Sequence, residues 1–484
     1  MKIHLLAIEP FEERYTEQWY RWWKDGLEAE GHTVSMIDGV NIEEATEREG
    51  GEWLDPTKTW IWKGRQLENL ARAFYTKQIQ DGDVILSLDF WNPCLTGALY
   101  MRDTTGIKVK IGGFYHAGAS DPNDFLARMG CRKWGLDVER GWAKGIDFIL
   151  CGSHFAGMML RENLSMFENS GSKIYATGYP INKEELLDKA NFVEWSKRDR
   201  IVVFPHRLAP EKQPELFEEL KNKYLQKYGD DGTIFVRSRD VCSNKKEYYD
   251  LLAKSKVSFS AAKQETFGIA QQEAACLGAW LVNPLCCSYP EVSRGSGVFY
   301  KPYDIDEAVS LVHELLETKK NEAFYSEWNS NAVKRASKVM MNGSTLLPID
   351  YIDRGLVETY YDFWKGRYDD KETVFINKLP QDVTAKAHFS QINWKSIDQI
   401  YFTGSYDFSS CEHRSYFHHM ESLKQYKIVV ARNYGEHNCL WWREILGQYK
   451  EKIKIIHKLH FDQKYDAVGE LEVGEPFKLV SYTK

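Results

Sequence analysis

The most informative segment of this sequence lies just past the middle of the chain. It reads Glu265-Thr266-Phe267-Gly268-Ile269-Ala270-Gln271-Gln272-Glu273-Ala274-Ala275-Cys276-Leu277-Gly278. A β-rich segment precedes it, a glycine suits a tight turn within it, and the alanine-rich remainder is typical of a buried helix. The pattern predicts a strand end, a turn and a helix that begins near Phe267.

Two carboxylates in this stretch, Glu265 and Glu273, lie eight residues apart. On a helix this spacing corresponds to about 12 Å, which is too far for a cooperating acid–base pair but suits the two ends of an elongated ligand. Free backbone amides at the start of such a helix favour an anionic group such as a diphosphate. A buried helix with a solvated glutamate at each end fits the same spacing, so the spacing alone leaves both interpretations open.

On both sides of this stretch, β-rich segments alternate with helical patterns. This alternation predicts parallel sheets covered by helices, with ligands at the carboxyl ends of the strands. The strands expected in residues 1–182 are 2–8, 33–37, 83–88, 107–114, 147–151 and 173–177. Those expected in residues 195–348 are 201–205, 233–236, 257–260, 280–283 and 298–300. The fold class is therefore α/β, with two Rossmann-like domains facing a cleft.

Three further segments complete the domain organisation. The Lys/Glu-rich stretch 182–200 is typical of a linker that contains a helix. The helical pattern within residues 349–369 is long enough to cross back onto the first domain. Residues 370–484 form an additional α/β region of unassigned role, with strands expected at 373–377, 399–403, 427–431 and 452–457.

Length and composition exclude several classes of protein. A chain of 484 residues is too long for one hydrophobic core, and an aromatic content of 14% argues against disorder. Neither a long apolar run nor a leader-like start is present, and the nine scattered cysteines favour reduced thiols, so we expect a cytoplasmic protein. A net charge of −7 argues against a globally basic nucleic-acid binder.

With its surroundings, the stretch from Glu265 to Glu273 resembles the E-x7-E motif of retaining GT-B glycosyltransferases, above all glycosyltransferase family four. The resemblance continues without a gap through the strand 280–283 and the turn 290–292, which reads Pro-Glu-Val. It covers roughly residues 1–368, weakly before residue 195 and strongly after it.

A second match lies upstream, where Arg207-Leu208-Ala209-Pro210-Glu211-Lys212 resembles the family's G-R-L-x-P-E-K-G loop. This chain departs from that pattern at two positions, with His206 in place of the first glycine and Gln213 in place of the last. The departures put the backbone shape of the loop in doubt more than its charge.

The resemblance implies transfer of a sugar from a UDP- or GDP-linked donor with retention at the anomeric carbon. Glu265 would hold the donor sugar, Glu273 the ribose, and Arg207 with Lys212 the diphosphate, since guanidinium and ammonium neutralise phosphate charge. These cations and the helix dipole replace a bound metal, so no metal or other cofactor is expected. The remaining donor contacts would come from Thr266, Phe267, Gly268 and Ile269.

The acceptor side of the resemblance is weaker. The segment 9–14, Glu-Pro-Phe-Glu-Glu-Arg, replaces the glycine-rich loop common in the family, whereas His116 stands where the family often has a pocket histidine near the transferred sugar. A lone histidine is more often structural or solvated than functional. In segment 125–144, basic and apolar residues together would suit a membrane surface, but two acidic residues reduce the positive charge of this segment.

A glycan or lipid-linked saccharide is the acceptor that the family implies. The alternative is a hydroxymethylated base in DNA, which some viral enzymes of similar architecture glycosylate and which residues 370–484 would help to hold. A duplex acceptor would also require extrusion of the base. A further alternative is a non-catalytic protein that binds a sugar nucleotide, but the chain retains all four charged residues, Arg207, Lys212, Glu265 and Glu273, which argues against it. Another is a nucleotide-sugar epimerase, which the continuous E-x7-E helix disfavours.

Two further groups of residues fit more than one role. Four residues that follow expected strands would supply zinc-type ligands, namely Cys411, His413, His437 and Cys439. Their spacing matches no known module, so solvated loops explain them better. Tryptophan rings stack on sugars and bases, and they also pack in cores. The tryptophans in question are Trp19, Trp22, Trp23, Trp60, Trp62, Trp91, Trp441 and Trp442.

Overall fold

The computed structural model divides the chain into two compact units, residues 1–349 and 350–484. The residues that it describes are 1–10, 15–39, 56–121, 123–163, 173–293, 296–318 and 324–342, together with six short strands of the second unit. The helix expected within 349–369 and the four zinc-type candidates of the second unit lie outside these described residues.

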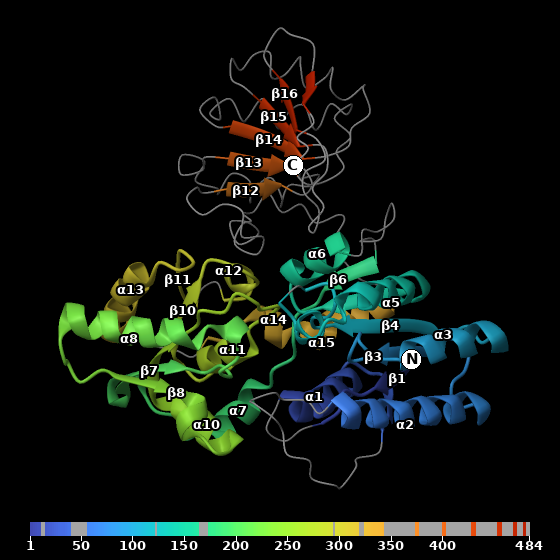
Figure 1. The fold of residues 1–484 in the computed structure, drawn as a ribbon. Coiled ribbons are helices and arrows are strands. Elements are labelled where there is room, and N and C mark those ends of the chain that lie inside the picture. Colours follow the sequence, from blue (N-terminus) through green and yellow to red (C-terminus); the bar gives the residue numbers. More distant parts are fainter. Residues whose placement is uncertain are drawn as a thin grey trace. The chain divides into compact units, whose positions relative to one another are not determined.

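The first domain is built on a sheet of six parallel strands in the order β2-β1-β3-β4-β5-β6 (Figure 1). The strands are β1 (Lys2–Leu6), β2 (Thr33–Ile37), β3 (Val84–Ser87), β4 (Lys110–Tyr115), β5 (Phe148–Cys151) and β6 (Ile174–Ala176). Each lies in a range that the sequence predicts, with ends that differ by a few residues. The parallel order confirms the Rossmann-like prediction for this domain.

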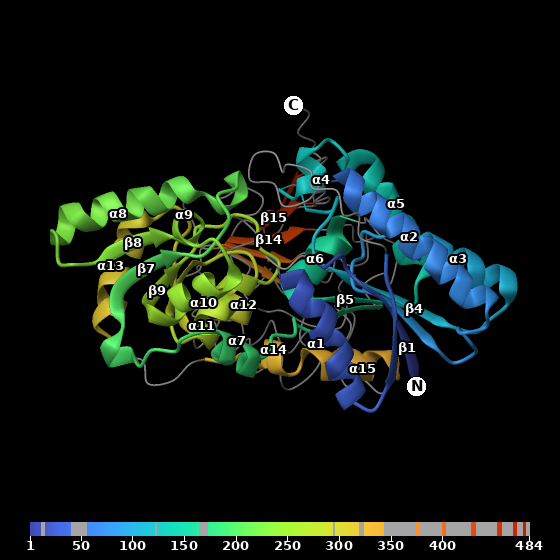
Figure 2. The same ribbon diagram turned by 90° about the horizontal axis from the view of Figure 1, so that it is seen from below.

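Helices cover both faces of this sheet. They are α1 (Tyr15–Ala29), α2 (Pro56–Tyr75), α3 (Cys94–Thr105), α4 (Phe125–Arg128), α5 (Arg132–Gly145) and α6 (His154–Asn163). Helix α1 lies against one face, and α2, α3 and α5 lie on the other (Figure 2). Trp19, Trp22 and Trp23 are buried between α1 and the sheet, so these three tryptophans belong to the core.

The second domain has five parallel strands in the order β11-β10-β9-β7-β8. They are β7 (Asp199–Phe204), β8 (Ile234–Arg237), β9 (Ser255–Phe259), β10 (Trp280–Pro284) and β11 (Gly297–Tyr300). Its helices are α8 (Pro214–Tyr228), α9 (Ser238–Val241), α10 (Lys245–Lys254), α11 (Ile269–Cys276), α12 (Tyr289–Val292) and α13 (Ile305–Glu317). This arrangement confirms the second Rossmann-like domain.

Alternation along β7 shows how this second core forms. Val202 and Phe204 pack with α8 and α13 on one face, while Ile201 and Val203 pack with α10 and α11 on the other. A strand buried on both faces reads as a continuous apolar run, because successive side chains point to opposite sides. Figure 1 shows the helices on the two sides of β7 and β10.

The predicted start of the motif helix is wrong by two residues. Helix α11 begins at Ile269, because Gly268 adopts a left-handed conformation with φ 82° and ψ 49° that does not continue a helix. A Cβ atom at this glycine would lie 2.8 Å from the Tyr289 ring. Phe267 therefore belongs to the turn before the helix.

Short elements connect the two domains of the first unit. The linker contains α7 (Lys183–Lys189) and a 3₁₀ turn, η2 (Trp195–Lys197), and the chain later returns through α14 (Glu327–Ser330) and α15 (Ala332–Met340). Helix α15 packs against α1, where His32 Nε2 lies 2.7 Å from Ser337 Oγ. A crossing back onto the first domain thus occurs before the range 349–369 that the sequence assigns to it.

The second unit contains a six-stranded sheet in the order β12-β13-β14-β15-β16-β17. The strands are β12 (Thr373–Ile376), β13 (Gln399–Phe402), β14 (Lys427–Ala431), β15 (Ile453–Ile456), β16 (Val468–Leu471) and β17 (Lys478–Val480). The first four are parallel and the last two antiparallel. The four expected strands of this region are among them.

Candidate functional site

The structure joins the two predicted motifs through one ion pair. Lys212 ends the 3₁₀ turn η3 (Pro210–Lys212) after β7, and its Nζ donates to Glu265 Oε2 at 2.8 Å and to the carbonyl oxygen of Gln264 at 2.7 Å. The side chains are only 10% and 16% exposed. Burial alone would raise the pKa of Glu265, but the nearby ammonium of Lys212 outweighs it and lowers that pKa.

The loop that carries Lys212 lacks the two glycines of the resembled pattern, and the structure shows what stands at each position. Gln213 adopts φ 52° and ψ 57°, a left-handed conformation that glycine takes without strain. His206 is buried against Phe204, with ring centroids 5.1 Å apart. Burial, reinforced by Lys212, lowers the pKa of His206 to about 3, so this ring is neutral near pH 7.

Arg207 lies in the same loop and is paired with Glu211. Glu211 is 1% exposed, and its second oxygen lies 3.7 Å from a guanidinium nitrogen of Arg128 on α4 of the first domain. Arg207 and Lys212 are therefore two cations of one loop, each with a carboxylate beside it, and Lys212 reaches the segment that precedes α11. A planar guanidinium and a point-like ammonium are the groups that bind phosphate oxygens.

Residues 266–269 form the turn and the first residue of α11. Ser153 of the first domain donates to the Thr266 carbonyl oxygen at 2.6 Å. The Phe267 ring stacks on Tyr179, also of the first domain, with centroids 4.6 Å apart. Gly268 provides the left-handed turn, and Ile269 opens the helix. These contacts place the start of α11 against the first domain.

Glu273 lies on α11 and is buried. The hydroxyls of Tyr248 and Tyr249 lie 3.2 and 3.1 Å from its two oxygens. Burial raises the pKa of Glu273, against the opposing effect of nearby Lys245. Tyr249 also contacts Gln18 of α1 at 3.0 Å, so this carboxylate is tied to the first domain as well.

His116 follows β4 and has a partner for each ring nitrogen. Nε2 lies 2.7 Å from the Leu88 carbonyl oxygen, which only accepts, so Nε2 carries the hydrogen in the neutral ring. Nδ1 then accepts from the Tyr179 hydroxyl at 2.8 Å. Because Tyr179 stacks on Phe267, the structure connects His116 to the motif turn through a single aromatic ring.

Sequence reasoning missed Tyr179 and Asp121. Tyr179 follows β6 directly, at the edge of the sheet where strand ends place ligand contacts, so its position was the available signal. Asp121 lies in the loop after β4 and contacts Gln264, close to Lys212. Burial raises the pKa of Asp121 to about 6, which local hydrogen bonds and Lys212 partly offset. No pattern in the sequence marks this residue.

The described residues contain neither a cluster of metal ligands nor a membrane-spanning helix. Within the described ranges, no group of three or more His, Cys, Asp and Glu side chains is placed to hold a metal ion. In the same part of the chain, none of the helices is both long and apolar enough to pass through a bilayer.

No protein-family model matches the chain. Among solved structures, a sucrose-phosphate synthase from Thermosynechococcus elongatus is similar at 14% identity and a TM-score of 0.46, over 70% of this chain and 94% of that one. A lipopolysaccharide outer core galactosyltransferase is similar at 13% identity and a TM-score of 0.40, over 71% and 96%. A UDP-GlcNAc 2-epimerase from Methanocaldococcus jannaschii is similar at 12% identity and a TM-score of 0.40, over 71% and 100%.

Proposed function

We propose that this chain is a retaining glycosyltransferase that takes its sugar from a nucleotide-sugar and works without a bound metal. The observation that carries the proposal is the buried ion pair of Lys212 and Glu265 at the start of α11. A largely buried charge pair costs desolvation energy, so its presence beside a helix N-terminus and a second cation favours a functional role.

The cations have a clear task in this reaction. Charge develops on the diphosphate as its bond to the anomeric carbon breaks, and fixed positive groups in a water-poor site stabilise that charge. Lys212 and Arg207 supply two such groups, and the first amides of α11 supply the helix dipole. These groups perform the task that a divalent cation performs in metal-dependent transferases.

The carboxylates hold hydroxyl groups of the donor. Glu265 accepts from Lys212 and from the Gly268 backbone amide, and its remaining lone pairs face the donor sugar. The hydroxyls of Tyr248 and Tyr249 each contact one oxygen of Glu273, and each oxygen retains a lone pair for a ribose hydroxyl. Thr266, Phe267, Gly268 and Ile269 line the donor between these two contacts.

Bond formation occurs on the same face of the sugar from which the diphosphate leaves. The acceptor oxygen forms a bond to the anomeric carbon, the bond to the phosphate oxygen breaks, and the acceptor proton passes to that departing oxygen. His116, although assigned a catalytic role by the resemblance, contributes by holding Tyr179 against Phe267, because both of its nitrogens are engaged.

Nucleotide release from a panel of UDP-, GDP- and ADP-sugars tests the proposal. We expect Lys212→Ala and Glu265→Ala each to reduce turnover by on the order of 100-fold, as for loss of a charge-stabilising group. Lys246→Ala is the matched control, because Lys246 forms a pair of the same kind with Asp250 at 2.7 Å but is 61% exposed. That variant should retain full turnover.

Three results would contradict the proposal. Wild-type protein that binds a nucleotide-sugar without releasing nucleotide would be a binding protein. Conversion of the donor into an epimer without transfer would indicate an epimerase. Turnover of the Lys212 and Glu265 variants within twofold of wild type would remove the roles assigned to these residues.

A further inference from the structure

Three neighbouring strands of the first sheet, β4, β5 and β6, each lead into a loop that contacts the segment 264–267 before α11. In strand order, the contacts are Asp121 with Gln264, Ser153 with Thr266 and Tyr179 with Phe267. The order of the contacts along the segment follows the order of the strands in the sheet. The first domain therefore holds the motif turn at several successive residues.

The hydroxyl of Ser153 makes two hydrogen bonds in a fully buried position. Its Oγ accepts from the Ala156 amide at 3.1 Å in the first turn of α6, and it donates to the Thr266 carbonyl oxygen at 2.6 Å. A carbonyl oxygen only accepts, so the direction of the second bond is fixed. The start of α6 thereby holds the backbone of the motif turn.

The Tyr179 ring occupies a space that a glycine leaves open. A Cβ atom at Gly152 would lie 1.9 Å from the Tyr179 ring and 3.1 Å from the Phe267 ring. The two rings stack with centroids 4.6 Å apart and an interplanar angle of 26°, and both are buried. The stacked pair thus packs directly on the backbone that follows β5.

The other parts of Tyr179 are fixed by hydrogen bonds. Its hydroxyl donates to His116 Nδ1 at 2.8 Å. Its carbonyl oxygen accepts from Asn329 Nδ2 at 3.0 Å, and Asn329 is 3% exposed. The ring, the hydroxyl and the backbone of Tyr179 each have a separate support, so the position of the ring is set before a ligand arrives.

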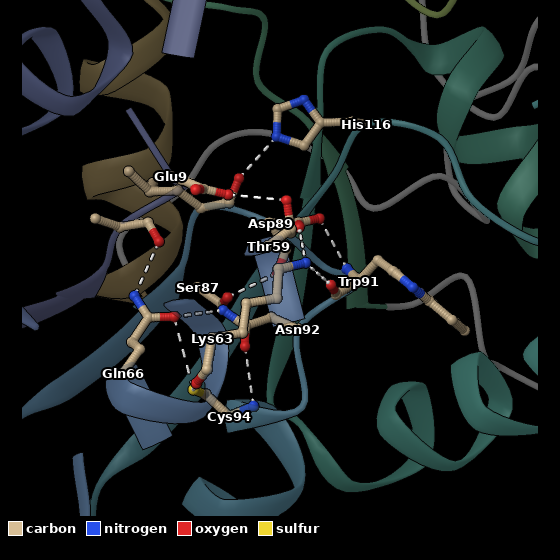
Figure 3. Close-up of polar contacts among 12 residues, drawn as sticks. Glu9, Thr59, Lys63, Gln66, Ser87, Asp89, Trp91, Asn92, Cys94 and His116 are labelled. Carbon is tan, nitrogen blue, oxygen red and sulfur yellow. Dashed lines mark hydrogen bonds and ion pairs between the residues drawn. The ribbon is translucent and has the colours of Figure 1, made fainter. Parts of the chain in front are cut away.

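The loop after β3 in turn supports His116. The Leu88 carbonyl oxygen of this loop accepts from His116 Nε2 at 2.7 Å. Lys63 of α2 donates to Asp89 Oδ2 at 2.7 Å and to the Trp91 carbonyl oxygen, as Figure 3 shows. One buried ammonium therefore holds two residues of the loop that orients His116.

The motif turn carries an amide that orients Glu265. The Gly268 backbone amide hydrogen-bonds to the Glu265 carboxylate, which also accepts from Lys212. A shift of the turn would move this amide and with it the carboxylate. Glu273 and Arg207 have partners outside the turn, so the groups assigned to the nucleotide would stay in place.

We propose that Ser153 and Tyr179 are positioning residues, which hold the turn 266–268 so that Glu265 meets the sugar of the donor. They act through the turn and not by contact with the reacting atoms. This inference rests on the proposed function, because the turn belongs to the donor site of that reaction. Loss of either contact lowers the rate and the affinity for a nucleotide-sugar, but not the affinity for the free nucleotide.

Two measurements on the full chain test the proposal. Titration calorimetry gives the Kd of UDP, GDP and ADP and of their glucose conjugates, and nucleotide release gives kcat. We expect Ser153→Ala to reduce kcat about tenfold, as for a misplaced group, and to raise the Kd of the conjugate about fivefold, as for a lost hydrogen bond. The Kd of the free nucleotide should stay within about twofold of wild type.

Three further variants separate positioning from packing. Ser153→Thr keeps the hydroxyl and should restore kcat to within about threefold of wild type. Tyr179→Phe keeps the stacked ring and loses only the bond to His116, so its kcat should fall less than about threefold. Tyr179→Leu removes the ring and should resemble Ser153→Ala in kcat and in both Kd values.

Ser255→Ala is the matched control. Ser255 is as buried as Ser153 and also donates to a backbone carbonyl oxygen at 2.6 Å, that of Leu251. It opens β9, so it lies at the amino edge of the second sheet and away from the motif turn. The variant should lose a similar hydrogen bond and keep kcat and both Kd values within about twofold of wild type.

The proposal is overturned if Ser153→Ala and Tyr179→Leu keep kcat and the Kd of the conjugate within twofold of wild type. Equal losses of affinity for the free nucleotide and the conjugate would overturn it as well, because they indicate damage to the whole site. The expected pattern of Kd values without nucleotide release from any donor would contradict the proposed function alone. Wild-type protein that binds neither nucleotide nor conjugate would contradict both.

Discussion

At the scale of single residues, backbone conformation decides whether the loop from His206 to Gln213 can place Lys212. Gln213 occupies the left-handed region at φ 52°, at the position where the resembled loop has glycine. A non-glycine residue in this conformation costs about 1–2 kcal/mol. The left-handed turn at Gln213 therefore lowers stability, and the hydrogen bond from the Gln213 amide to the Pro210 carbonyl oxygen partly offsets this cost.

The strain at Gln213 is measurable by comparing two small substitutions. Gln213→Gly relieves it, whereas Gln213→Ala removes the same side-chain contacts and keeps a Cβ atom. We expect the glycine variant to exceed the alanine variant by about 1 kcal/mol in free energy of unfolding, measured by urea denaturation with unchanged slope. An alanine variant that equals or exceeds the glycine variant would show that the left-handed conformation carries no strain.

Single residues also mark the limit of prediction from sequence. The chemistry of Lys212 and Glu265 was expected from the motifs, and the structure brings these two side chains together at 2.8 Å. Tyr179 was not expected, because it lies far from both motifs in sequence and its role depends on stacking across the two domains. Contacts of this kind follow from domain packing, which no local pattern records.

At the scale of elements, a side chain of the second domain binds the N-terminus of α6 in the first domain. Glu291 of α12 accepts from the backbone amides of His154 and Phe155 at 2.9 and 3.2 Å, and its Oε1 lies 2.6 Å from His154 Nδ1. Carboxyl oxygens at a helix N-terminus accept from backbone amides that have no partner within the helix. Here the side chain that does so comes from the second domain.

This contact predicts a pH-dependent stability. Burial raises the pKa of Glu291 to about 8, against smaller opposing effects of the Phe155 amide and Arg335. The folded state therefore keeps a proton that the unfolded state releases above its ordinary pKa of about 4.3. The contribution of Glu291 to the free energy of unfolding is therefore greatest below about pH 4.3 and falls as the pH rises toward 8.

Glu291→Gln removes this titration while keeping an oxygen that accepts the helix amides. We expect the melting temperature of the variant, relative to wild type, to increase steadily between pH 4.5 and 8. Glu314→Gln on α13 is the control, since Glu314 is exposed, and its difference from wild type should not follow that trend. A constant difference for Glu291→Gln across this range would show that Glu291 ionises normally in the folded protein.

Among the elements, the strands were predicted best. Strands β2 and β10 match their expected ranges to within one residue. Strand β10 is largely buried, and a buried parallel strand is a short apolar run that is visible in the sequence. The start of α11 was misplaced, since the alanine-rich pattern does not show that Gly268 is left-handed. Helix boundaries depend on cap geometry, which the packing of Tyr289 against Gly268 imposes here.

At the scale of the whole first unit, the two domains contact each other near the carboxyl ends of their sheets. Ser153, Tyr179 and His154 of the first domain contact Thr266, Phe267 and Glu291 of the second. Helix α15 then returns to the first domain, where Lys110 Nζ donates to the Met340 carbonyl oxygen at 2.9 Å. Alternating strands and helices predicted the two domains, but not which segments hold them together.

In the proposed reaction, a sugar leaves its nucleotide beside Lys212 and Glu265 with its configuration kept. The anomeric coupling constant in a proton NMR spectrum of the first product, formed from a nucleotide α-sugar and a saccharide acceptor, measures that configuration. Retention gives an α-linked product with wild-type protein, which should form about 100-fold more slowly with Lys212→Ala. A β-linked first product, or an α-linked product that the variant forms as fast as wild type, would contradict the proposed reaction.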